Sequence, residues 1–129
     1  MAATSGGALV VLSTAGSRED GERLARALVE ERLAACVNLV PGVRSFYRWE
    51  GSVCCDDEVL LVIKSTRERF AALRARVREL HSYELPELVG LEPSLGDPEY
   101  LAWVVTESGQ SEETAGSAES RESEEPGPG

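Results

Sequence analysis

Five consecutive apolar residues, Val59 to Ile63, are the segment that most constrains the fold. A strand with one face in water alternates apolar and polar residues, whereas an unbroken run is typical of a strand buried on both faces. We therefore expect a central strand over 58–63. A second apolar run at 8–12, bounded by glycine and serine, predicts another buried strand.

Two segments have the apolar spacing of amphipathic helices. The first begins after Ser17, a favourable N-cap residue, carries acidic residues in its first turn, and is expected to end near 33–35. The second is expected over 66–80. A proline at position 98, which suits a first helical turn, predicts a short last helix over 98–106.

The remaining apolar segments complete an alternating order. A strand is expected over 36–49, with a bulge at Pro41-Gly42 because proline cannot donate to a strand ladder. A turn at 50–52 leads into the central strand, and 86–91 predicts a fourth strand. The order strand, helix, strand, strand, helix, strand is that of the α+β ferredoxin-like split βαβ sandwich, with both helices on one face of an antiparallel sheet.

The hairpin predicted over 36–64 is long for this fold. Its aromatic residues Phe46, Tyr47 and Trp49, together with the 58–63 run, supply more apolar surface than two short helices can cover. We therefore expect a partner chain to cover it, and a second copy of the same chain is the expected partner because most soluble oligomers are homo-oligomers.

Charge and composition divide the chain into a domain over 1–107 and an acidic tail over 108–129. The tail contains Glu, Ser, Gly and Pro without aromatic or branched aliphatic residues, so we expect it to be disordered. The net charge of −10 argues against nucleic-acid binding. No apolar run reaches the roughly 20 residues of a membrane span, and no signal peptide is recognisable. Three cysteines, an odd number, favour a reduced chain in the cytoplasm.

Five segments, in register and in order over about 8–107, carry a resemblance to a known family. They are Arg32-Leu33-Ala34-Ala35-Cys36-Val37-Asn38, Tyr47-Arg48-Trp49-Glu50-Gly51, Glu58-Val59-Leu60-Leu61-Val62-Ile63-Lys64-Ser65, His81-Ser82-Tyr83-Glu84-Leu85-Pro86-Glu87 and Tyr100-Leu101-Ala102-Trp103. They resemble the CutA family of divalent-cation tolerance proteins. The resemblance implies a ferredoxin-like homotrimer related in shape to the PII signalling proteins, with divalent-cation binding, copper especially, and no enzymatic activity. Ser82 stands where the family usually has proline.

The resemblance implies Cys36 and His81 as metal ligands, because thiolate and imidazole suit copper. The alternatives are that Cys36 is a small buried hydrophobe and that His81 caps a helix C-terminus. The topology separates the two residues by about 17–20 Å within one chain, so a shared metal requires a neighbouring chain. A second possible site combines Cys54 and Cys55 with the acids at 56–58, which could equally be exposed thiols beside a solvated turn.

The matched segments also predict a ligand cleft. Its expected residues are Trp49, Glu58, Lys64, Tyr83, Glu84 and Glu87. The alternative for Lys64 is an ordinary solvated lysine at a strand end. The alternative for Trp49 is a role in packing or in an interface. Three functions remain open: a metal-binding trimer; a PII-like regulator or scaffold that binds a small ligand or protein between protomers; and, least favoured, an enzyme with Cys36 or Cys55 as nucleophile and His81 as base.

Overall fold

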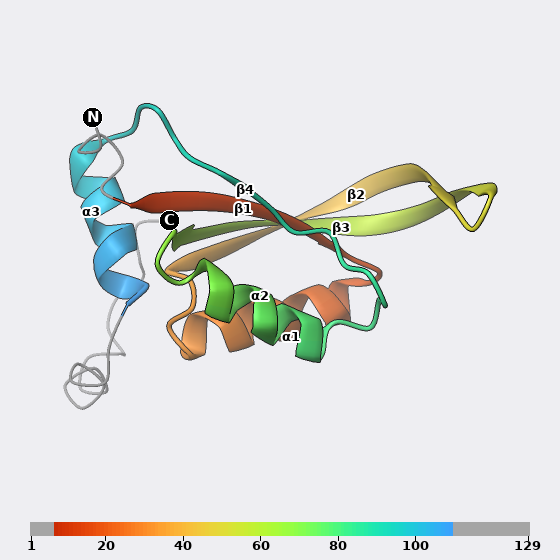
Figure 1. Cartoon of the computed structure of the whole chain (residues 1–129), viewed down its shortest axis with the longest axis horizontal. Helices are drawn as coiled ribbons and strands as arrows, with labels where there is room; N and C mark the ends of the chain where they lie inside the picture. The colour runs from red at the N-terminus through yellow and green to blue at the C-terminus, as the bar shows by residue number, and fades with distance from the viewer. Residues whose placement is uncertain (1–6, 110–129) are drawn as a thin grey trace.

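The structure, a computed structural model, describes residues 7–109 and consists of four strands and three helices (Figure 1). The expected acidic tail, apart from its first two residues, lies outside the described residues. In chain order the elements are β1 (Ala8–Ala15), α1 (Arg18–Glu30), β2 (Cys36–Trp49), β3 (Ser52–Thr66), α2 (Phe70–Leu80), β4 (Val89–Leu91) and α3 (Pro98–Glu107).

The four strands form one antiparallel sheet in the order β2-β3-β1-β4. Helices α1 and α2 lie side by side on one face of it (Figure 1). This arrangement confirms the predicted α+β ferredoxin-like fold, with β3 in an interior position between β1 and β2. Helix α3 packs at the end of the sheet where β1 begins.

The core lies between the sheet and the two helices. Alternate residues of β1 and β3, among them Val11 and Ile63, are fully buried against Leu24, Leu28 and Leu73. The intervening residues point to the other side of the sheet because successive strand side chains alternate. We call that other side the open face; between its two ends it carries Val10, Leu12, Leu60 and Val62, which are half-buried.

Several element boundaries differ from the sequence prediction. Helix α1 ends at Glu30 rather than near 33–35, because Arg32 adopts a φ of 60° and the amides of Leu33 and Ala34 turn back to the carbonyl of Leu28. Helix α2 starts at Phe70, not 66, because Thr66 still pairs with Ala8 in the sheet. The fourth strand is shorter than 86–91.

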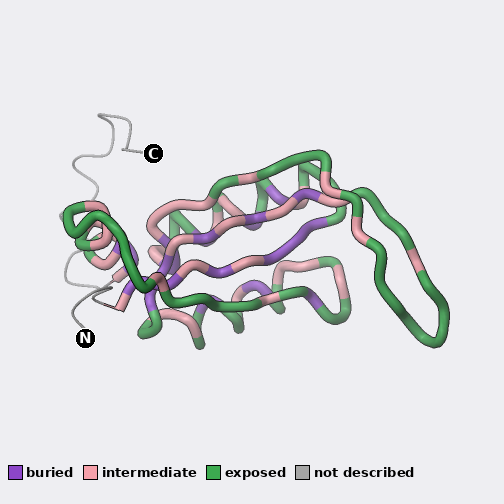
Figure 2. Tube along the Cα trace, turned by 90° about the horizontal axis from the view of Figure 1, so that it is seen from above, coloured by how far each residue is buried: buried purple, intermediate pink, exposed green. Residues whose placement is uncertain are grey.

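Strand β3 begins at Ser52 instead of 58. The two strands of the hairpin therefore remain paired through the polar residues before 58, up to the turn. The expected bulge is present, as a register shift between Val40 and Val43. Beyond it, residues 43–58 leave the body of the domain as a twisted two-stranded ribbon that is mostly exposed (Figure 2). We call residues 43–58 the hairpin arm.

Candidate functional site

A cleft of about 750 Å³ lies where the hairpin arm leaves the body of the domain. Strand β1, the arm and the segment between α2 and β4 all contribute to its walls. The lining residues are Thr14, Ser45, Phe46, Tyr47, Trp49, Glu58, Tyr83, Glu84, Leu85, Pro86 and Glu87. Five of the six residues predicted for the ligand cleft are therefore together, and Lys64 is the exception.

Glu58 holds two walls of the cleft together. Its Oε1 accepts a hydrogen bond from the Ser45 hydroxyl at 2.6 Å, and its Oε2 accepts one from the Tyr83 hydroxyl at 2.6 Å. Burial and the bond to this carboxylate both raise the pKa of the Tyr83 phenol above its usual value. Tyr83 also lies against Gly16, where a Cβ would sit 3.1 Å from the phenol oxygen. The segment after α2 is thus tied to both β1 and the arm.

Tyr47 makes a similar contact farther out on the arm. Its hydroxyl donates to the carboxylate of Asp56, and this hydrogen bond raises the pKa of the exposed phenol to about 12. Sequence reasoning assigned Tyr47 to an interface and did not assign Ser45 to the cleft. The sequence feature that could have placed them in the cleft is their spacing with Trp49: residues 45, 47 and 49 alternate along β2, so their side chains lie on one side of the sheet.

His81 is bound to the backbone through both ring nitrogens. Nδ1 accepts from the amide of Tyr83 at 3.0 Å, so Nε2 carries the proton and donates to the carbonyl of Thr14 at 2.7 Å. The imidazole therefore fixes the loop that positions Tyr83 against β1. A metal ion at either nitrogen would have to displace one of these bonds.

Cys36 lies at the far end of the open face, opposite Lys64 in the β2–β3 ladder. Its Sγ lies 3.9 Å from the Lys64 Nζ and 4.0 Å from the Asn38 Oδ1. His81 binds β1 at Thr14, which pairs with Leu60, four residues from Lys64 along β3. Four residues of strand span about 13 Å, so Cys36 and His81 lie well apart along the sheet within one chain.

Cys54 and Cys55 lie on the outer part of the arm. Because they are successive strand residues they point to opposite faces: Cys54 pairs with Tyr47, and Cys55 pairs with Phe46. The acids follow the same alternation, so Asp57 accompanies Cys55 while Asp56 and Glu58 accompany Cys54. The Cys55 Sγ lies 3.1 Å from the Arg44 guanidinium, which also pairs with Asp57.

Over residues 7–109, no three His, Cys, Asp or Glu side chains lie together as a metal-binding group. Within the same range, none of the helices is both long and apolar enough to cross a membrane. On the open face, the described residues carry an aromatic, acidic cleft at one end and a thiol beside an amine at the other.

Comparison with known proteins identifies relatives over most of the chain. A family model described as CutA1 divalent ion tolerance protein matches residues 9–107. The divalent-cation tolerance protein CutA of Thermus thermophilus is 51% identical over 100 residues, covering 78% of this chain and 97% of that protein. The chloroplastic protein CutA of Arabidopsis thaliana is 44% identical over 96 residues, covering 74% of this chain and 53% of that protein. The chain thus spans nearly all of the first relative and about half of the second.

Solved structures agree with the sequence comparison. The structure of the divalent cation tolerance protein from Thermus thermophilus has a TM-score of 0.78 at 50% identity, covering 79% of this chain and 99% of that one. The CutA1 structure from Oryza sativa has a TM-score of 0.77 at 41% identity, covering 81% of this chain and 95% of that one. Because the family model and the Thermus thermophilus relative both extend over more than two thirds of the chain, this protein belongs to the CutA1 divalent ion tolerance family.

Proposed function

We propose that this protein is a non-enzymatic, homotrimeric, copper-binding member of its family that serves metal tolerance. The observation that carries the proposal is the family match over residues 9–107, whose description names divalent ions rather than a reaction. The separation of Cys36 from His81 supports the non-enzymatic part, because a nucleophile needs its base within hydrogen-bond reach.

Copper binding is proposed to use ligands from more than one chain. A soft thiol such as that of Cys36 suits copper(I), and Asn38 adds an amide oxygen 4.0 Å from it. One chain supplies a single thiol at this point of the open face. Packing several copies with their Cys36 ends together would cluster several thiols, and thiolate ligands suit copper(I).

Competition with a copper(I) chelator under reducing conditions tests the metal assignment. Cys36→Ser should lose more affinity than His81→Ala, because both His81 nitrogens already bind backbone groups. The matched control is the Cys54→Ser, Cys55→Ser double variant, which should keep the wild-type affinity. If the double variant abolishes binding and Cys36→Ser does not, the metal site is on the hairpin arm and the assignment to Cys36 is wrong.

The homotrimer is proposed because the arm exposes large apolar side chains. Phe46 and Val53 are 69% and 68% exposed, and Trp49 is 39% exposed. Such residues dominate interface energies when a partner covers them. Analytical ultracentrifugation at micromolar concentration should give three times the 13.9 kDa mass of one chain. Sedimentation as a monomer would contradict this part of the proposal.

A PII-like regulator or scaffold is the second candidate, and the 750 Å³ cleft is the observation that favours it. Its size and its mixture of aromatic and acidic residues are those of a small-molecule site. If the wild-type protein binds no copper(I) while remaining trimeric, this candidate replaces the first. For either function we propose a cytoplasmic location, which fractionation of cells that express the full chain would test.

A further inference from the structure

Helix α2 and the turn before it carry the densest basic segment of an acidic chain. Five of the thirteen basic residues lie within 67–78, whereas the net charge of the whole sequence is −10. Arg67 pairs with Glu92, and Arg76 pairs with Glu31. Among residues 7–109, no carboxylate lies within ion-pair distance of the other three, which are Arg69, Arg74 and Arg78. The helix therefore presents cationic groups that the described residues do not neutralise.

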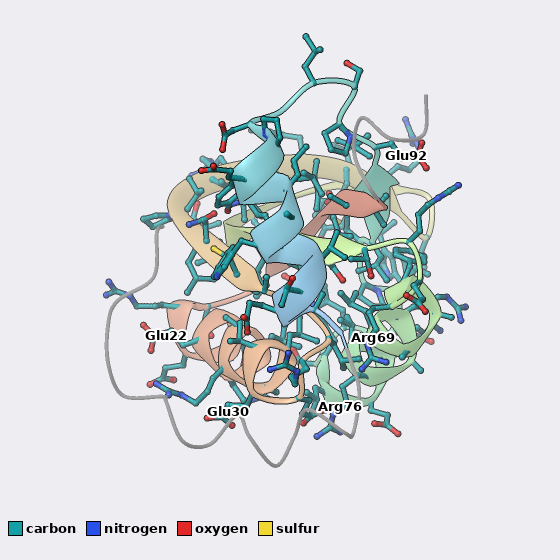
Figure 3. All side chains as sticks on the ribbon, turned by 90° about the vertical axis from the view of Figure 1, so that its left-hand side faces the viewer. Glu22, Glu30, Arg69, Arg76 and Glu92 are labelled. Atoms are coloured by element: carbon teal, nitrogen blue, oxygen red, sulfur yellow. The ribbon has the colours of Figure 1, made fainter. Side chains whose placement is uncertain are left out.

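These arginines lie along two flanks of α2. Arg69 and Arg76, both labelled in Figure 3, are seven positions apart and lie on the flank next to the end of α1. Arg74 and Arg78 are four positions apart and lie on the other flank. The exposed surface between the flanks carries three small side chains and two acids, which are Ala71, Ala72 and Ala75 with Glu68 and Glu79. An extended polypeptide on this surface has arginines within reach on both sides.

The C-terminal end of α3 lies beside the same helix. The Arg32 guanidinium donates to the carbonyl of Thr106 at 3.1 Å and pairs with Glu107 at 3.6 Å. The backbone carbonyl of the same Arg32 accepts a hydrogen bond from the Arg69 Nε at 3.3 Å. One arginine residue therefore separates the end of α3 from the first arginine on the α1 flank of α2. The acidic tail begins at this place.

The acidic tail has the complementary charge and sufficient length. Residues 110–129 contain six glutamates and one arginine, and no other charged residue. The first glutamates, Glu112 and Glu113, follow Gly109 by three and four residues, which is at most about 14 Å of extended chain. The axial distance from Arg69 to Arg78 is also about 14 Å, at 1.5 Å per helical residue. The glutamates of the tail can therefore reach the whole length of the basic surface.

We propose that the acidic tail docks on the arginine flanks of α2 in its own chain and shields them from other polyanions. The inference is independent of the bound metal and of the oligomeric state, because it uses α2 and α3 rather than the open face. Each exposed ion pair contributes little by itself, but the covalent link keeps the tail at a high local concentration. Because the tail has no aromatic or branched aliphatic residue, the contact relies on charge and requires no fixed tail conformation.

Carbodiimide coupling of amines to carboxylates tests the contact in the full chain. Lys64→Arg removes the only lysine, and Arg74→Lys with Arg78→Lys then places amines on α2 without a change of charge. Linked peptides should join position 74 or 78 to glutamates within 112–125. The yield should fall between about 0.1 M and 1 M salt, as the Debye length shrinks from about 10 Å to 3 Å. Arg48→Lys in the Lys64→Arg chain is the matched control, because Arg48 is exposed and makes no ion pair among the described residues but lies on the hairpin arm.

Isotope labels identify the chain that supplies the tail. In an equimolar mixture of ¹⁴N-labelled and ¹⁵N-labelled chains, assembled together, docking within one chain gives linked peptides of a single isotope. Linked peptides of mixed isotope would show that the tail docks on a neighbouring copy and would overturn the proposal. Tail peptides coupled to position 74 or 78 no more often than to position 48 of the control would overturn it as well.

Binding of a fluorescent polyglutamate probe measures the shielding independently. Replacing the six tail glutamates with glutamine should tighten probe binding about fivefold or more, because it removes a tethered competitor for the arginines. Arg74→Gln with Arg78→Gln, added to that chain, should abolish the gain. Arg26→Gln with Arg48→Gln, which also removes two exposed arginines without an ion pair among the described residues, should keep it.

Two results of the probe measurement would contradict the docking. An unchanged affinity after the glutamate replacement would show that the tail does not shield the arginines. A gain that is lost equally in both arginine variants would show an effect of net charge alone rather than a contact with α2. Circular dichroism of each variant checks that the fold is retained, and the substituted arginines are exposed, so their replacement leaves the core intact.

Discussion

Strand β3 consists of two halves that both pair with β2 but have very different surroundings. From Val59 to Thr66 it pairs with β1, and over residues 60–64 it also pairs with β2; alternate side chains are buried beneath the helices. From Ser52 to Glu58 it pairs with β2 alone, and it has no buried residue. Figure 2 shows the change from body strands that alternate buried and intermediate residues to a mostly exposed arm.

The two halves therefore have different roles. Residues of the inner half stabilise the single chain, whereas residues of the outer half remain free to contact other chains. The inner half gains its stability from apolar burial between layers. A two-stranded ribbon without such a layer is only marginally stable in water. The arm is therefore expected to be stabilised by contacts that the single chain does not provide, and changes in the two halves should affect different measurements.

The largest expected effect is on the free energy of unfolding. Leu61 is 1% exposed in the core, and Leu61→Ala should lower that free energy by about 3 kcal/mol through lost burial and a residual cavity. Val53→Ala, at a position of the same strand that is 68% exposed in the single chain, should lower it by clearly less, because only contacts with a partner can be lost there. Urea denaturation at equal protein concentration measures both. Equal losses would mean that the arm is as tightly packed as the core.

A substitution of Trp49 tests whether the hairpin arm contributes to assembly rather than to the stability of the single chain. Trp49→Ala should weaken assembly about tenfold or more, because a large aromatic side chain at an interface is commonly a main source of binding energy. Its effect on the fold of the single chain should be small, since it is partly exposed on the arm. Sedimentation over a dilution series measures the assembly, and circular dichroism checks the fold. A trimer of unchanged affinity would mean that the tryptophan serves only the cleft.

The body of the fold was predictable because its residues obey two periodicities. The apolar run at 59–63 and the helical spacing of Leu24 and Leu28 are consequences of burial between two layers. The arm follows neither pattern strongly, because both of its faces are exposed in one chain. The sequence pattern therefore assigns the polar segment Cys55-Asp56-Asp57 neither to the turn at 50–52 nor to the strand expected from 58, although it is paired strand.

Most of the residues that line the cleft could be predicted from the sequence, but their arrangement could not. Its polar residues were found through matched segments, which do not say which of them meet in one chain; Lys64 lies outside the cleft, at the other end of the same side of β3. The two backbone bonds of His81 were equally invisible, because the carbonyl of Thr14 is 67 residues away. The salt bridge from Arg76, which Figure 3 labels on α2, to Glu31 likewise joins segments distant in sequence.

A smaller effect is expected at the boundary between body and arm. Gly42, in the bulge, has a φ of 81°, and an added Cβ would meet no atom within 4 Å. Gly42→Ala should therefore lower the free energy of unfolding by about 1 kcal/mol through backbone strain alone. Gly51 has a similar φ of 85° at the tip of the arm. Gly51→Ala should affect global unfolding less, because the tip can open locally; a larger effect at the tip would reverse the comparison.

A further small effect, which depends on pH, is expected at the tyrosine that ties the arm to the body. Tyr83→Phe removes the bond to Glu58 and should cost about 1 kcal/mol near neutral pH. The raised pKa of Tyr83 gives the pH dependence its sign: the folded state retains the phenol proton more strongly than the unfolded state. Its contribution is therefore present below about pH 10, the ordinary tyrosine pKa, and decreases as the pH rises above it. Denaturation curves between neutral and strongly alkaline pH should show the wild type losing its advantage over Tyr83→Phe. Tyr47→Phe is the matched control, because Tyr47 bonds Asp56 within the arm and should leave the link to the body unchanged. A constant difference between wild type and Tyr83→Phe across this range would mean that the phenol proton does not stabilise the junction.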